Sequence, residues 1–188
     1  MSEFSELAVH VGTVDPDFRF PRGLTSLELK VRDEFFGVGS LTVLHRLSTG
    51  VFNRAPFDLS ALTGLTWLNP NTPPVSRLPT SLVKCGLCVE CDTDLSPLTL
   101  LTELSPQLEQ GVRVMFPTQL KKLRIFAGRL ADSNIGDVAL ESFKSGCSRR
   151  ITQGKLERLP KTFREFRGEF HPDSLRDHLG ALFPLMQF

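Results

Sequence analysis

The sequence predicts a solenoid, in which the chain coils through similar turns of about 20 residues each. Leucine is the most abundant residue, at 30 of 188, and one leucine-rich phrase returns almost unchanged at residues 59–68 and 95–104. A second phrase has a proline followed by two apolar residues spaced by three, and it occurs at 20–29, 78–87 and 116–125. One such turn cannot bury its apolar side alone, so the turns have to stack on one another.

The apolar pairs within these phrases set the period of the array. The first members of the pairs, which we call the anchors, are Leu24, Leu44, Leu65, Leu82, Leu101, Leu120, Leu140 and Phe163. The steps between successive anchors range from 17 to 23 residues. After each anchor, apolar residues alternate with polar ones, as at Leu27 and Leu29, which is the period of a β-strand. The sequence therefore predicts short parallel strands that share one buried side and one exposed side.

The Leu-Ser-x-Leu-Thr-x-Leu-Thr-x-Leu phrase and the Pro-Thr-Ser-Leu phrase at 79–82 resemble the leucine-rich repeat family, and the resemblance covers residues 20–185. It implies an α/β solenoid: a right-handed superhelix with a concave sheet of short parallel strands and a convex side made mostly of turns and 3₁₀ helix. The position that holds Asn or Cys in the family is occupied by Arg32, Glu90 and Gly128, so we expect irregular repeats.

The two ends of the chain differ from the array between them. We expect one structural domain, with an N-terminal cap at 1–19, the leucine-rich repeat array at 20–172 and a C-terminal capping segment at 173–188. Leucines at helical spacing in the last segment predict a short capping helix. The final residues 182–188 are too apolar for a free tail, so we expect them to fold back on the core or to contact another chain.

Charge and the start of the chain bear on location and partners. The 22 Lys and Arg residues nearly balance the 21 Asp and Glu residues, so no global field favours nucleic acid or an anionic membrane as a partner. The first residues are acidic and lack the basic and apolar regions of a secretory signal. No apolar stretch approaches the roughly 18 residues needed to cross a bilayer. We therefore expect a cytoplasmic protein.

The cysteines give the sharpest chemical signal. Cys85, Cys88 and Cys91 lie within seven residues, and thiolates at such spacing can hold zinc or part of an iron–sulfur cluster. No fourth ligand follows them closely, and Cys147 lies almost three repeats away. Cys85 also occupies the core position that Leu27 holds in another repeat, which favours a buried cysteine. We expect no cofactor and no metal, and a metal centre at these three cysteines remains the alternative.

The exposed side of the predicted strands would form the concave face. In its C-terminal half basic residues outnumber acidic ones, which favours an acidic peptide or protein as partner. Trp67 is the only tryptophan of the chain and the best hot-spot candidate, unless its ring packs on the proline-rich loop at 70–74. The predicted partner-binding residues are Trp67, Lys84, Lys121, Lys122, Arg124, Lys144, Arg164 and Arg167. The alternative is that these charges only solvate the face.

No phosphate-binding glycine loop, zinc-protease helix or nucleophile elbow occurs in the sequence, so we expect no enzyme and name no catalytic residues. The resemblance implies a non-catalytic protein-binding scaffold that uses its concave strand face. Two alternatives remain open. One is a metal or iron–sulfur protein that uses the cysteine cluster, and the other is a structural repeat protein that associates with itself through an end of the array.

Overall fold

The structure is a computed structural model, and it describes residues 5–10, 18–30, 38–50, 57–69, 75–109, 111–125, 134–145 and 165–167. The described residues form short parallel strands that wind as a β-solenoid, with helix limited there to two 3₁₀ turns at Val38–Ser40 and Ile135–Asp137. The chain divides into two compact units, residues 1–88 and 89–188, and each is described by itself.

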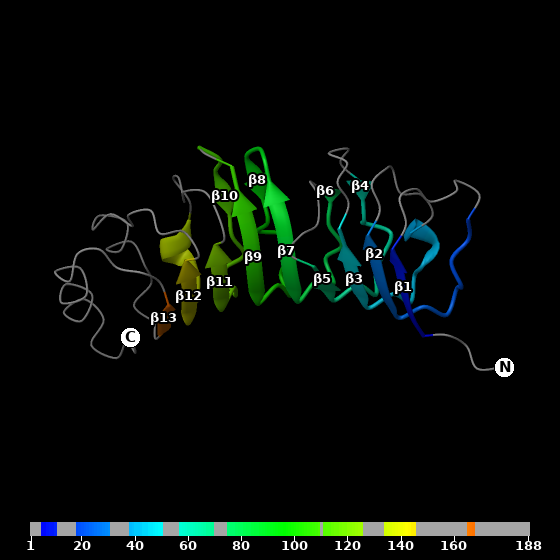
Figure 1. Cartoon of the computed structure of the whole chain (residues 1–188). Coiled ribbons are helices and arrows are strands. Elements are labelled where there is room, and N and C mark those ends of the chain that lie inside the picture. Colours follow the sequence, from blue (N-terminus) through cyan, green and yellow to red (C-terminus); the bar gives the residue numbers. More distant parts are fainter. Residues whose placement is uncertain are drawn as a thin grey trace. The chain divides into compact units, whose positions relative to one another are not determined.

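The first unit has one main sheet and one small sheet, which Figure 1 shows in blue to green. The strands of the main sheet follow one another in chain order, and all neighbouring pairs are parallel. They are β1 (Glu6–His10), β2 (Ser26–Lys30), β3 (Arg46–Thr49), β5 (Trp67–Leu68) and β7 (Lys84–Val89). The last residue of β7 falls in the second unit. A second, two-stranded parallel sheet pairs β4 (Phe57–Asp58) with β6 (Val75–Arg77). From β3 to β7 the chain thus alternates between the two sheets as it coils.

The second unit repeats this plan. Its main sheet holds four strands in chain order, namely β9 (Glu103–Leu108), β11 (Lys122–Ile125), β12 (Ser142–Ser145) and β13 (Glu165–Arg167), and all neighbouring pairs are parallel (Figure 1). Its small sheet pairs β8 (Thr93–Asp94) with β10 (Val114–Met115) in parallel. The prediction of short parallel strands along the chain is confirmed in both units.

Buried side chains form ladders across the strands of each main sheet. Leu27, Leu47, Leu68 and Cys85 are register partners from one strand to the next in the first unit, and each is at most 3% exposed. Leu104, Leu123 and Phe143 are register partners in the same way in the second unit, and each is at most 5% exposed. All the anchors that the structure describes, Leu24, Leu44, Leu65, Leu82, Leu101, Leu120 and Leu140, are fully buried. The predicted period is therefore correct over these seven positions, and Phe163 lies outside the described residues.

The same backbone turn leads into six main strands, β2, β3, β5, β7, β9 and β11, although two different sequence phrases encode it. The anchor N–H of Leu65 donates to the carbonyl of Leu62 at 2.9 Å, which is the leucine version of the turn. In the proline version, the N–H of Leu120 donates to the carbonyl of Pro117 at 3.1 Å. Proline serves here because the turn uses its carbonyl and needs no N–H from it. The two repeated phrases are therefore interchangeable solutions for one turn.

Aspartates start the return from the small sheets to the main sheets. Asp58 accepts the backbone N–H of Ser60 at 2.8 Å, and Asp94 accepts that of Ser96 at 2.9 Å. Hydrogen bonds from the serine side chains and backbone lower the pKa of both aspartates, because they favour the charged form. These turns lie at matching positions of the two copies of the leucine-rich phrase.

The segments between the main strands contain the expected turns and 3₁₀ helix, and they also contain the short strands β4, β6, β8 and β10, which the sequence did not predict. The leucine-rich repeat family, the right-handed sense and the α component of an α/β solenoid stay predictions. Residues 6–10, expected within an N-terminal cap, form β1 at the edge of the main sheet. The C-terminal capping helix lies outside the described residues. In the part of the chain that the structure describes, no helix has the length and apolar character needed to span a membrane.

Gly64 marks a place where one coil approaches the next too closely for a side chain. A methyl group at this position would meet the Thr42 carbonyl oxygen at 2.9 Å and the Leu44 carbonyl oxygen at 3.4 Å. We expect Gly64→Ala to lower the free energy of unfolding by about 1–3 kcal/mol, because the backbone has to shift. Urea unfolding measures this difference.

Gly39→Ala provides the control, because a methyl group there would find no atom within 4 Å and its φ is not positive. We expect this variant to be unchanged or slightly more stable, by up to about 1 kcal/mol, since alanine restricts the unfolded chain. Equal stability of the two variants would contradict the close approach at Gly64.

Candidate functional site

We call the solvent-facing side of the main sheet the outer face. It carries the side chains that alternate with the buried ones along each strand. In the second unit it has two rows that cross the strands. The first row contains Glu103, Lys122 and Ser142, which are register partners on β9, β11 and β12. The second row lies two residues further along each strand and contains Ser105, Arg124 and Lys144. Neighbouring strands lie about 4.8 Å apart, so side chains of one row are within reach of each other.

Two of the predicted basic residues form ion pairs with the neighbouring coil. Lys122 Nζ lies 3.1 Å from Glu103 Oε1, and Lys121 Nζ lies 3.2 Å from Glu141 Oε1 just before the strands begin. All four side chains are at least partly exposed, so each pair contributes little stability on its own. Lys121 and Lys122 therefore have structural partners that the sequence did not identify.

Arg124 and Lys144 are arranged differently, because two cations occupy directly opposed positions. They are register partners on β11 and β12, and both side chains are exposed. Like charges opposite one another across neighbouring strands are destabilising. The two cations border a depression of about 390 Å³ on the outer face. The outer-face residues lining it are Glu103, Ser105, Lys122, Arg124, Ser142 and Lys144.

The last two predicted basic residues fall near the end of the described chain. The backbone of Arg167 in β13 is the register partner of Lys144 and thus continues the row of Arg124 and Lys144. Arg164 lies outside the described residues. The structure therefore brings four predicted cations, Lys121, Lys122, Arg124 and Lys144, onto neighbouring coils of one unit.

Trp67 lies on the outer face of the first unit. It is half-buried, and its register partners are Arg46 on one side and Lys84 on the other. The Arg46 Cζ lies 5.0 Å from the centroid of the Trp67 ring, which is the geometry of a cation–π contact. The predicted site residues Trp67 and Lys84 therefore share one row, and Arg46 is a member that the predicted site did not include. The loop at 70–74, the alternative packing surface for Trp67, lies outside the described residues.

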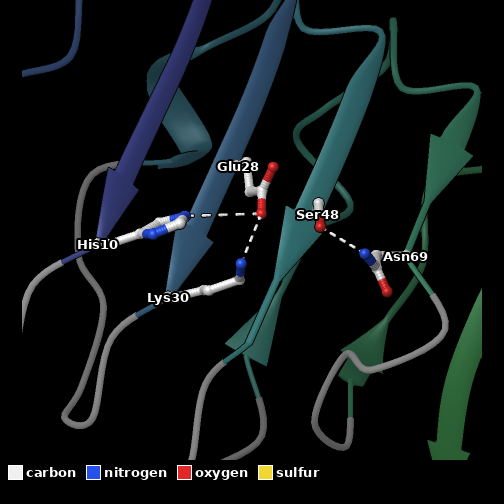
Figure 2. Close-up of polar contacts among 5 residues, drawn as sticks. All are labelled: His10, Glu28, Lys30, Ser48 and Asn69. Atoms are coloured by element: carbon white, nitrogen blue, oxygen red, sulfur yellow. Dashed lines mark hydrogen bonds and ion pairs between the residues drawn. The ribbon is translucent and has the colours of Figure 1, made fainter.

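Polar contacts within and between strands occupy another part of the outer face of the first unit (Figure 2). Glu28 Oε1 lies 3.0 Å from Lys30 Nζ and 3.6 Å from His10 Nε2. The hydrogen bond and charge of Lys30, with a smaller contribution from His10, lower the pKa of Glu28. On the adjacent strands, the Asn69 side-chain amide donates to the Ser48 hydroxyl (Figure 2). This region consists of charges and hydrogen-bonding groups that already have partners.

The cysteine cluster does not converge on one point. Cys85 and Cys88 lie three residues apart in β7, and side chains alternate along a strand, so the two point to opposite sides of the sheet. Cys85 is buried in the core ladder, where burial raises the pKa of its thiol, whereas Cys91 is exposed after the strand. Among the described residues, no three His, Cys, Asp or Glu side chains are grouped to hold a metal ion. The predicted core position of Cys85 is confirmed.

These positions predict different reactivities for the thiols. We expect iodoacetamide at pH 8 to alkylate Cys91 rapidly in the folded protein, and Cys85 only after unfolding, because a thiol must be both accessible and deprotonated to react. Peptide mass mapping distinguishes the two sites. Stoichiometric zinc that protected Cys88 and Cys91 together from the reagent would instead support the metal-centre alternative.

No family model matches the sequence, and the search of curated proteins gives no match either. A fold alone does not determine a function, since one architecture hosts many unrelated activities. The chemistry of the outer face is therefore the basis on which a function can be assigned.

Proposed function

We propose that this protein is a non-catalytic binding module that captures an acidic segment of a protein partner on the outer face of β9, β11 and β12. The observation that carries the proposal is the opposed pair of cations, Arg124 and Lys144, at the border of a depression. Three basic side chains line this depression against the single carboxylate of Glu103. An acidic partner is the complement of such a surface.

The scaffold beneath these side chains favours binding. The inward neighbours Leu104, Leu123 and Phe143 are at most 5% exposed, so the strands that present the cations are fixed by the core. A site on rigid strands loses little conformational entropy when a partner binds. Bringing two cations together costs free energy in the unbound protein, and a bound anion offsets that cost.

The proposal includes two finer points that rest on the sequence as much as on the fold. We place the protein in the leucine-rich repeat family, a choice supported by the 20-residue period and by the buried anchors. We also propose a cytoplasmic location, which is supported by three cysteines that are free thiols.

A charge reversal at Lys144 tests the binding surface. We expect Lys144→Glu to keep the fold and to change the free energy of unfolding by less than about 1 kcal/mol, in the stabilising direction, because it places opposite charges in register with Arg124. The same change should abolish capture of the partner from a lysate of the source cells. Urea unfolding and mass spectrometry of the captured proteins give the two readouts.

The matched control is Arg113→Glu, which makes the same charge change at an exposed residue just before β10, outside the main sheet. A partner retained by the wild type and by this control, but lost from Lys144→Glu, supports the proposal. An identical set of captured proteins from all three would remove the outer face from consideration.

Self-association is the second candidate, and one observation favours it. In the described residues, β1 is the last strand at its edge of the main sheet, and its apolar residues Leu7 and Val9 are only half-buried. Unpaired edges readily pair with another chain. If this edge pairs, light scattering should give a mass above that of the 21.0 kDa monomer at micromolar concentration. A monomer at all concentrations would exclude stacking through β1.

A further inference from the structure

We propose, building on the proposed function, that the depression binds the phosphomonoester group of a phosphorylated side chain in the partner's acidic segment. The depression spans three strands of the second unit, with Ser105 on β9, Arg124 on β11, and Ser142 and Lys144 on β12 at its border. Its volume of about 390 Å³ accommodates one such side chain and is not large enough for a folded element.

The charge of the depression fits a dianion better than a carboxylate. Lys122, Arg124 and Lys144 supply three positive charges, and Glu103 supplies the only negative one among the lining residues. Glu103 lies 3.1 Å from Lys122, so part of the positive charge is already compensated within the depression. A phosphomonoester carries about −1.5 to −2 at pH 7, whereas a carboxylate carries only −1. The phosphomonoester therefore matches the net charge, and a single carboxylate leaves a surplus of positive charge.

The donors also suit a tetrahedral anion. Arg124 offers a planar fork of N–H groups, Lys144 offers three rotatable N–H donors, and the two bases stand in register on neighbouring strands. Their side chains can converge on one anion, because the strands are only about 4.8 Å apart. Ser105 on β9 and Ser142, the register partner of Lys122 on β12, add hydroxyl groups to the lining. A phosphate with three terminal oxygens can use donors from three strands at once, and a planar carboxylate with two oxygens cannot use as many.

The described outer face of the first unit is arranged differently, and this contrast supports the assignment. There the acidic Glu28 already contacts Lys30 and His10, and Arg46 stacks on Trp67 (Figure 2 shows the Glu28 contacts). In the second unit, two cations directly opposite one another border a depression that also has hydroxyl donors. This combination is what an anion of high charge requires.

Binding of small probes tests the site directly. We expect N-acetyl-O-phosphoserine methylamide to shift the amide NMR signals of β9, β11 and β12, with an affinity at least roughly tenfold above that of the O-sulfoserine and glutamate counterparts. The sulfate ester has the same shape with one charge fewer, so it separates charge from geometry. Equal affinities for the three probes would overturn the assignment and leave only a general preference for anions.

Variants locate the site on the protein. Lys144→Gln should weaken phosphoserine binding by about tenfold or more, and Lys144→Arg should largely restore it, since a charge-assisted hydrogen bond is lost and regained. Arg113→Gln is the control for a cation outside the depression and should have no effect. Unchanged binding by Lys144→Gln would place the probe elsewhere and overturn the assignment.

Treatment of the lysate with phosphatase separates this inference from the proposed function. A partner that is captured by the wild type, lost from Lys144→Glu and lost after phosphatase treatment supports both. A partner that is lost from Lys144→Glu but still captured after phosphatase treatment overturns the phosphate assignment and leaves the acidic-segment proposal standing. A set of captured proteins that Lys144→Glu does not change overturns both.

Discussion

One repeated hydrogen-bond arrangement fixes how the coils stack, and the rest of each unit depends on it. The carbonyl one residue after an anchor accepts two backbone N–H groups from the next coil. Thr25 O accepts from His45 and Arg46 at 2.8 and 3.0 Å, and Thr102 O accepts from Lys121 and Lys122 at 2.9 and 3.0 Å. Because the arrangement recurs at the start of the strands, it defines their register through the backbone alone. A shift of one residue would exchange the buried and exposed sides of a strand. The same backbone hydrogen bonds therefore align the leucine ladders in the core and place Arg124 opposite Lys144 on the outer face.

Much of the fold could be predicted because two features of the sequence, the alternation of apolar residues and the spacing of the anchors, each indicate part of it. The apolar alternation gives the strands, and the spacing of the anchors gives the coil, so Leu104 and Leu123 could be matched before the structure was known. Even Cys85 could be assigned to the core, because it replaces leucine at a fixed position of the repeat. The small sheets could not be predicted, because the stretches Phe57–Asp58 and Val114–Met115 are too short to show any period. Their strands depend on pairing with a neighbouring coil, which is a tertiary contact.

The candidate site could be predicted only in part. Sequence alternation placed Lys122, Arg124 and Lys144 together on one face but treated them as equivalent. A cation can face a carboxylate or another cation on the neighbouring strand. The outcome depends on residues about 20 positions away in the sequence and on the orientation of long side chains. Glu103 faces Lys122, whereas Lys144 faces Arg124, and the sequence alone does not distinguish these two arrangements. Arg46 was left out of the predicted site for the same reason, since its contact with Trp67 crosses two coils.

The architecture assigns stability and recognition to alternate residues of the same strand. In β11, Leu123 and Ile125 lie in the core, and Lys122 and Arg124 lie outside it. The core ladder constrains every second residue to be apolar and of similar size, because a poor fit leaves a cavity or a clash. The outer residues have no such constraint, so their charges can differ from coil to coil without any change in the fold. Opposed cations at such positions are thus not required by the packing, and bringing them together costs free energy. In a protein built this way, the outer residues that oppose local stability are the first candidates for a binding surface.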